Sequence, residues 1–325
     1  MKRFRKNSTI DEKLLFAYLI LVAIGLIMVY SISSIMAESR FGSHLFFFKN
    51  QMMWAVISLV AMFVICKFDL PKLSVYSAPA LLLIVLLLSL VFLMPARNGS
   101  HRWLMLGPLT AQPSEMFKFV MIVYLAFSLS NQKRNLADLK QLLFPYVPIL
   151  GLGMSLIVLE PDLGTTIVIF LTALGMFFLA GARMKHLLAG FVPMIGAVSF
   201  MVFVLGYKKA RIMDYFGAVM DPLQGSYQVK QAALTLGSGG LLGTGLGEGR
   251  QKLFFLTYPH TDFIFAVLSE EFGLLGNTFL LVLYALLIGR GLMIAANAPT
   301  LFSRLLAGSV TLIFFTYAFV NMGMV

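Results

Sequence analysis

The sequence has few charged residues and almost no cysteine. Charged residues make up 12% of its 325 positions, and Asp and Glu together account for 14 residues, whereas a soluble domain keeps roughly a quarter of its residues charged. The single cysteine, Cys66, excludes an intrachain disulfide and a cysteine metal cluster. The four histidines have no spacing that is typical of a zinc site. A disulfide-rich domain and a structural zinc domain are therefore excluded.

Apolar residues make up 59% of the chain and fall in nine long runs. A helix needs about 17–25 mainly apolar residues to cross a bilayer. The fourth run is shorter and reaches this length only if Glu115 and Lys118 are included, and the eighth is interrupted by Glu270 and Glu271. The runs are 14–37, 50–66, 73–96, 119–132, 141–159, 163–182, 187–207, 263–289 and 305–325.

These runs predict an all-α integral membrane protein with about nine transmembrane helices in a single polytopic domain, residues 1–325. Inside lipid, every backbone polar group must be paired within the protein, which helices and closed β-barrels achieve. The alternating strands of about ten residues that a barrel needs are absent from the sequence. The run 14–37 is too long for the apolar part of a typical signal peptide, so we expect an uncleaved first span.

The distribution of basic residues predicts the orientation of the spans. With a cytoplasmic amino terminus, short outer loops hold only Arg40, Lys49, Arg97, Arg102 and Lys118. Short inner segments then hold Lys2, Arg3, Arg5, Lys6, Lys13, Lys67, Lys72, Lys133, Arg134, Lys140, Arg183, Lys185, Arg290 and Arg304. This asymmetry follows the positive-inside rule. The net charge of +11 is thus mainly a signal of topology, with contact to anionic lipid second and nucleic acid not expected.

One long connection, about 206–261, is predicted to lie outside the membrane on the outer face. It contains a helix-like stretch at 226–236, followed by the glycine-rich stretch GSGGLLGTGLGEG at 237–249. Long loops in compact proteins are usually functional or disordered, and the apolar content of this one favours function. A nucleotide site is excluded, because the stretch lacks the GxxxxGK[ST] pattern and follows no buried strand. Close helix packing or a re-entrant segment explains the glycines better.

Acidic residues gather at predicted outer ends of spans. Glu160 and Asp162 lie in a short turn, EPDLG, and Asp262 lies beside His260 where the long loop enters the next span. Ionisable groups near hydrocarbon are costly and usually functional. Asp162 also suits a helix N-cap, so both interpretations stay open for the turn. Asp262 could likewise cap its helix, but the polar residues beside it, His260 and Thr261, favour a function.

Other charges have simpler interpretations. Glu115 and Lys118 are three residues apart on one helical face, which predicts a local ion pair. Glu270 and Glu271 lie about 12–14 Å deeper than Asp262 along a helix, and we expect a structural partner such as Lys118 or Arg102 for them. The basic residues of the outer face could bind phosphates, and these are Arg102, Arg211, Lys230, Arg250 and Lys252.

Five motifs carry a resemblance to a known family. They are HRWLMLGPLTAQPSEMFK (101–118), EPDLGTT (160–166), DPLQGSYQVKQA (221–232), GSGGLLGTGLGEGRQKL (237–253) and PHTDFIFAVLSEEFG (259–273). In this order they resemble the SEDS family (shape, elongation, division and sporulation), and its division-site branch more than its elongation branch. Family members usually have ten spans, so the resemblance implies that the tenth span is missing after NMGMV at 321–325.

The resemblance implies a peptidoglycan glycosyltransferase that polymerises lipid II on the outer face of the bacterial cytoplasmic membrane. It implies Asp262 as the essential aspartate, Asp162 as the aspartate of the PDLGT turn, and Glu115 with Lys118 as the glutamate and lysine of the QPSE motif. It also implies a class B penicillin-binding protein and other division-complex membrane proteins as partners, with the division septum as the place of action.

For the mechanism we expect Asp262 to take the proton of the acceptor sugar hydroxyl or to hold a divalent cation, Mg²⁺ or Mn²⁺. Substrate contacts are expected from Asp162, His260 and the cations Arg102, Arg211 and Lys252, which would stabilise the leaving diphosphate. No nucleotide is needed, because a lipid diphosphate activates the donor. Two alternatives remain: a flippase for a lipid-linked precursor, and a non-catalytic scaffold for division proteins.

Overall fold

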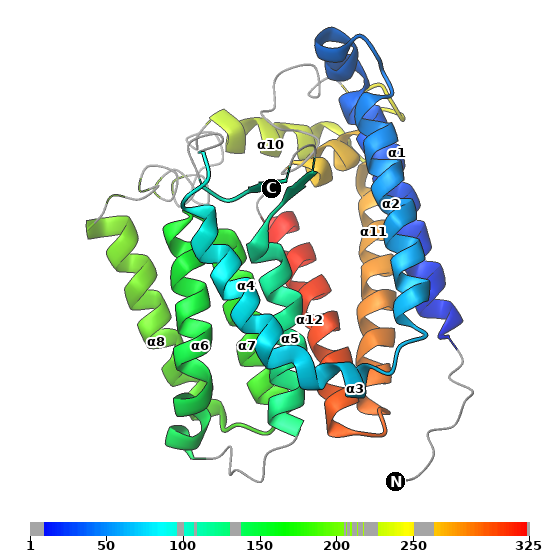
Figure 1. Ribbon diagram of the computed structural model, residues 1–325. Coiled ribbons are helices and arrows are strands. Elements are labelled where there is room, and N and C mark those ends of the chain that lie inside the picture. The colour runs from blue at the N-terminus through cyan, green and yellow to red at the C-terminus, as the bar shows by residue number, and fades with distance from the viewer. Residues whose placement is uncertain are drawn as a thin grey trace. The chain divides into compact units, whose positions relative to one another are not determined.

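The computed structural model describes residues 10–95, 101–106, 109–130, 138–204, 227–249 and 263–323, together with single positions at 206, 209, 213 and 217. Nearly all of the described regular structure is helical (Figure 1). The chain divides into two compact units. Unit 1 comprises Met1–Lys67, Val198–Arg290 and Ala318–Val325, and unit 2 comprises Phe68–Ala197 and Gly291–Tyr317. The interpretation of one polytopic domain stays a prediction.

All nine apolar runs overlap helices of the structure. The helices are α1 (Glu12–Phe41), α2 (Phe46–Ile65), α4 (Ser77–Val91), α5 (Pro113–Ser130), α6 (Leu139–Leu159), α7 (Leu163–Leu179), α8 (Met184–Ser199) continued by the π-helical turn η2 (Phe200–Val204), α11 (Ile264–Ala296) and α12 (Leu301–Gly323). Among the described residues, seven helices are long and apolar enough to cross a membrane, and two shorter apolar helices lie at Tyr146–Leu159 and Leu163–Leu179. The all-helical membrane fold is therefore confirmed, while the number of spans stays a prediction.

Apolar side chains on the surface of the helices suit a lipid solvent. In α2 no residue is buried, and Trp54 and Val60 keep 47% and 57% of their surface exposed. Such a helix would be insoluble in water, but lipid is as apolar as the side chains themselves. The protein is thus a polytopic membrane protein.

Unit 1 is built around α1 and α11. Helix α2 lies along α1 (Figure 1), and α10 (Tyr227–Ser238) begins one residue after the helix predicted at 226–236. The apolar core joins Met28 and Ile32 of α1, Ala232 of α10, and Ala266 and Val267 of α11. At the start of α1, Asp11 caps the helix by accepting a hydrogen bond from Leu14 N (2.9 Å) and also binds Arg290.

Unit 2 contains the larger core. Helix α4 packs on α5 (Figure 1) and continues from the short α3 (Leu70–Leu73) and η1 (Ser74–Tyr76). Its core is formed by apolar residues of α4, α5, α6, α7, α8 and the first part of α12, among them Leu88, Phe117, Tyr146, Met176 and Leu305. These helices position the polar residues at their ends.

One small strand pair was not predicted. Strands β1 (Leu104–Leu106) and β2 (Leu109–Ala111) form an antiparallel pair in which Met105 faces Thr110. Three-residue strands are too short to show the period-2 pattern that identifies strands. The dipeptide Gly107-Pro108, typical of turns, is the signal in the sequence that could have revealed the pair.

Close helix packing in unit 2 generates a first prediction. A Cβ atom on Gly153 of α6 would collide with the ring of Phe117, which is fully buried, whereas a Cβ atom on Gly151 would meet nothing within 4 Å. We expect Gly153→Ala to destabilise the protein by about 1–3 kcal/mol, because overpacking forces a buried ring out of its rotamer. Gly151→Ala is the matched control. Thermal unfolding in detergent measures both, and equal unfolding temperatures would contradict the packing.

Candidate functional site

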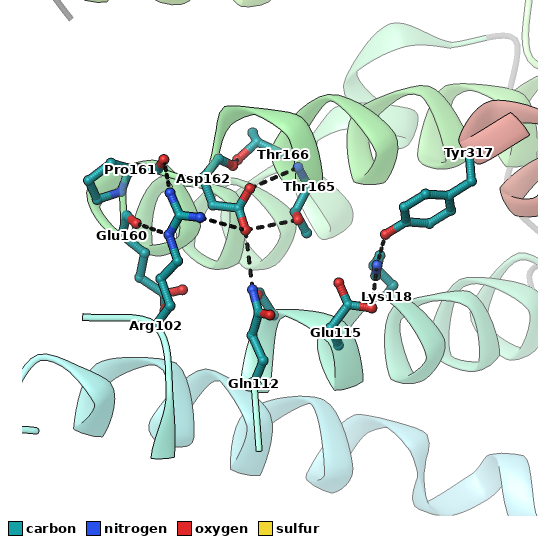
Figure 2. A network of polar contacts seen from close by, with 11 residues as sticks. Arg102, Gln112, Glu115, Lys118, Glu160, Pro161, Asp162, Thr165, Thr166 and Tyr317 are labelled. Atoms are coloured by element: carbon teal, nitrogen blue, oxygen red, sulfur yellow. Dashed lines mark hydrogen bonds and ion pairs between the residues drawn. The ribbon is translucent and has the colours of Figure 1, made fainter. Parts of the chain in front are cut away.

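Arg102 lies across the turn between α6 and α7 (Figure 2). Its Nε donates a hydrogen bond to the backbone oxygen of Glu160 (2.7 Å), and Nη2 donates to the backbone oxygen of Pro161. Carbonyl groups at a helix C-terminus have no partner within the helix, and basic side chains often satisfy them. Arg102 therefore ties the segment before β1 to the end of α6.

Asp162 caps α7 and links it to neighbouring segments. Its Oδ1 accepts from Thr165 N (3.2 Å), and its Oδ2 accepts from Thr165 Oγ1 (2.9 Å) and Gln112 Nε2 (3.2 Å). Thr166 Oγ1 donates to the backbone oxygen of Asp162 (2.8 Å). Arg102 Nη1 lies 4.0 Å from Asp162 Oδ2. The N-cap interpretation of Asp162 thus agrees with the geometry, and its contact with substrate stays a prediction.

Gln112 joins the beginnings of two helices. It precedes α5, and besides Asp162 its amide donates to Ser114 Oγ (2.9 Å). The amino-terminal ends of α5 and α7 therefore meet at the Arg102–Asp162 pair (Figure 2). Because the positive ends of both helix dipoles point at this place, it favours negative charge.

Glu160 is the most unusual group of the network. Its side chain is fully buried, and neither carboxylate oxygen has a hydrogen-bond partner within the described structure. Burial, followed by the negative charge of Asp162, raises the pKa of Glu160 from 4.5 to about 8, against the opposing effect of Arg102. Glu160 is therefore mainly neutral at pH 7.

Glu115 and Lys118 lie in the first turns of α5. Lys118 Nζ is 2.7 Å from Glu115 Oε2, and the lysine side chain is 2% exposed compared with 50% for the glutamate. Lys118 also donates to the hydroxyl of Tyr317 in α12. The buried ammonium thus has two oxygen partners, and the pair connects α5 to α12 within unit 2 (Figure 2).

The structure brings together only part of the predicted site. Arg102 and Asp162 lie side by side, whereas Asp262, His260, Arg211 and Lys252 fall outside the described residues and stay predictions. A partner of Glu270 or Glu271 among Arg102 and Lys118 also stays a prediction.

Sequence reasoning did not single out Gln112, Thr165 or Tyr317. Gln112 had a signal, since it is a polar residue directly before the proline that begins α5. Tyr317 had none, because a tyrosine inside an apolar run is ordinary.

The described residues contain no group of three or more His, Cys, Asp or Glu side chains that could hold a metal ion. The predicted ligand, Asp262, is not among these residues. The divalent cation therefore stays a prediction.

The amino-acid sequence is similar to those of known proteins. Residues 12–325 match the FtsW/RodA/SpoVE family of cell cycle proteins. The chain is 39% identical to stage V sporulation protein E of Bacillus subtilis, over 98% of this chain and 88% of that protein. It is 35% identical to a probable peptidoglycan glycosyltransferase FtsW of Geobacter metallireducens, over 97% of this chain and 85% of that protein.

Two solved structures have a similar fold. A chain of a peptidoglycan synthase complex, described as coordinating polymerization and crosslinking, is similar with a TM-score of 0.78 and 25% identity, covering 98% of this chain and 88% of that one. The rod shape determining protein RodA of Thermus thermophilus is similar with a TM-score of 0.66 and 25% identity, covering 96% and 84%.

Fold and polar network define a polytopic helical membrane protein with a charged site at the helix ends of one unit. The match over nearly the whole sequence identifies it further: this chain belongs to the FtsW/RodA/SpoVE family, and thus to the SEDS proteins.

The buried Glu160 generates a prediction on pH. Because its pKa is raised in the folded protein, the folded state holds the proton more tightly, and its stabilising effect, complete below pH 4.5, is lost as the pH rises to about 8. Glu160→Gln keeps the shape without the charge. We expect it to raise the free energy of unfolding at pH 8 but hardly at pH 5, by at most ~1.4 kcal/mol for each pH unit between, as measured by unfolding at both pH values. The exposed Glu248→Gln is the control. A gain that is independent of pH would contradict the assignment.

Proposed function

We propose that this chain is a peptidoglycan glycosyltransferase that polymerises lipid II into glycan strands at the outer face of the bacterial cytoplasmic membrane. The observation that carries the proposal is the match over residues 12–325 to a family with relatives named peptidoglycan glycosyltransferases. One of these, from Nitrosococcus halophilus, is 37% identical over 96% of this chain. We propose the activity for this chain on the basis of this sequence similarity.

The polar network of unit 2 supports an anionic substrate. Arg102 and the amino-terminal ends of α5 and α7 converge at one place, and Lys118 lies on the second turn of α5. Arginine and helix amino termini both bind phosphates well. In the described structure Arg102 donates to two backbone carbonyls. We therefore propose that it also stabilises the turn between α6 and α7. Asp162 would orient Arg102 rather than bind the diphosphate, because the Asp162 carboxylate and the diphosphate are both negatively charged.

The proposed chemistry is a direct glycosyl transfer. Asp262 takes the proton from the acceptor sugar hydroxyl as that oxygen forms a bond to the anomeric carbon of the donor. The bond from this carbon to the lipid diphosphate breaks, and the diphosphate leaves with the electron pair. Cationic side chains stabilise the negative charge that develops on it. Arg211, Lys252 and His260 are proposed to contribute from the long loop.

The setting of the reaction is also part of the proposal. We infer a cytoplasmic amino terminus from the basic residues of the predicted inner segments, which places Asp262 and Asp162 on the outer face. A similar chain belongs to a complex that couples polymerization to crosslinking. A crosslinking partner, a class B penicillin-binding protein, is accordingly proposed here, together with other division proteins at the septum.

The test is polymerisation of purified lipid II by the purified chain. We expect the unaltered chain to form glycan polymer and Asp262→Asn to lower the rate about 100-fold or more, because removal of a general base removes typically 10²–10⁴-fold of rate. Asp69→Asn is the control, since Asp69 is half exposed and its ion pair within the described structure is the local one with Lys72. A normal rate for Asp262→Asn would exclude its catalytic role, and no polymer from the unaltered chain would refute the activity.

The flippase alternative rests on a different observation. Glu270 and Glu271 are buried within the apolar helix α11, where a transport path would need charge. Reconstitution in liposomes separates the two functions. Transfer of labelled lipid II across the bilayer without polymer formation would favour the flippase, whereas polymer without transfer favours the transferase.

A further inference from the structure

Helix α11 is broken. At Gly273 the backbone has φ 63° and ψ −161°, a conformation that is not helical and that only glycine adopts readily. The break separates a short helix, 264–272, from the long remainder of α11. Near the break, backbone groups lose their partners along the helix, and a membrane protein tolerates this only where other parts of the protein supply new ones.

The glycine-rich stretch supplies these partners. Two amides of the stretch donate to carbonyls before the break, and two amides after the break donate to carbonyls of the stretch. These bonds are Thr244 N to Glu270 O (2.9 Å), Gly245 N to Glu271 O (3.1 Å), Leu274 N to Gly240 O (2.9 Å) and Leu275 N to Leu241 O (3.2 Å). Each segment thus donates hydrogen bonds to the other, so the backbone groups freed at the break and those of the stretch satisfy each other.

The approach is too close for side chains. A Cβ atom on Gly239 would lie 2.9 Å from the carbonyl carbon of Ser269 and 3.1 Å from Cα of Glu270. One on Gly243 would lie 2.7 Å from the carbonyl carbon of Phe272. These are backbone atoms, which cannot rotate away as a side chain can. Glycine at these positions is therefore a packing requirement.

The short helix 264–272 has two further attachments within unit 1. Its apolar face, with Ala266 and Val267, packs on Ala232 of α10 and on α1. At its far end the hydroxyl of Ser31 in α1 donates to the carboxylate of Glu271 (2.7 Å to Oε1). The short helix is thus held by α1 and α10 as well as by the glycine-rich stretch.

We propose that residues 239–245 of the glycine-rich stretch position the catalytic aspartate, Asp262. Asp262 precedes the short helix by two residues in the sequence, so the placement of that helix determines where the aspartate can reach. The stretch is hydrogen-bonded to the backbone on both sides of the break, so it sets the position of the short helix against the long part of α11. The inference rests on the proposed function, and it assigns the glycines to the geometry of the reaction rather than to substrate contact.

Gly239→Ala tests the proposal, with Gly237→Ala as the matched control. Both glycines lie at the end of α10, but a Cβ atom on Gly237 meets nothing within 4 Å. We expect Gly239→Ala to lower kcat by about 10- to 100-fold, because a displacement of about 1 Å can cost this much. The dissociation constant for fluorescent lipid II should stay within about twofold, and Gly237→Ala should match the unaltered chain in both quantities.

The rate is expressed per lipid II binding site, counted by titration. A variant that is only partly folded loses binding sites and activity together, so its rate per site stays normal, and this result would overturn the proposal. If Gly239→Ala does not fold at all, Thr244→Val replaces it, since it removes only the bond from Thr244 Oγ1 to Glu270 O (3.1 Å).

For Thr244→Val we expect kcat per site to fall about threefold, as loss of roughly one hydrogen bond implies. Normal rates per site in Gly239→Ala, or in Thr244→Val where it is needed, would refute the inference. If the unaltered chain polymerises lipid II in the same assay, the proposed function survives that result. Absence of polymer from the unaltered chain would instead refute the function itself.

Discussion

The pairing of backbone polar groups is the constraint on which the rest of this structure depends. A chain that crosses lipid has no water to satisfy an N–H or C=O group, so its apolar runs become helices. Every place where a helix ends or breaks then needs another partner. Arg102 supplies one to the carbonyls at the end of α6, Asp162 supplies one to the start of α7, and the glycine-rich stretch supplies several at Gly273.

The same constraint explains where function can reside. Unpaired backbone groups occur at helix ends and breaks, and binding sites in membrane proteins are often built there. In unit 2 two helix amino termini meet Arg102, and in unit 1 the break in α11 lies ten residues after the turn at Phe263. Each unit therefore contains one such arrangement at a helix end or break.

Much of the fold could be predicted, because length and hydrophobicity alone select membrane helices. Runs such as 163–182 and 305–325 overlap α7 and α12, and the EPDLG turn suited the N-cap that Asp162 forms. The strand pair at Leu104–Ala111 could not be read from periodicity, since its strands have three residues each. The run 263–289 likewise gave no sign of a break, because its glycines are isolated from one another, and isolated glycines are tolerated inside helices.

By itself, the sequence determined the class of protein, the positions of its helices and its family, since each of these depends on local composition or on ordered motifs. Only the tertiary structure decided the contacts: that Arg102 meets the turn before α7, that the buried Glu160 carboxylate has no hydrogen-bond partner among the described residues, and that residues 239–245 pair with α11. The bonds of Arg102 join residues 58 and 59 positions apart, and those of the glycine-rich stretch also join segments distant in the sequence. Which distant segments meet is determined by packing of whole helices and by unpaired backbone groups, and neither is visible in a local stretch of sequence.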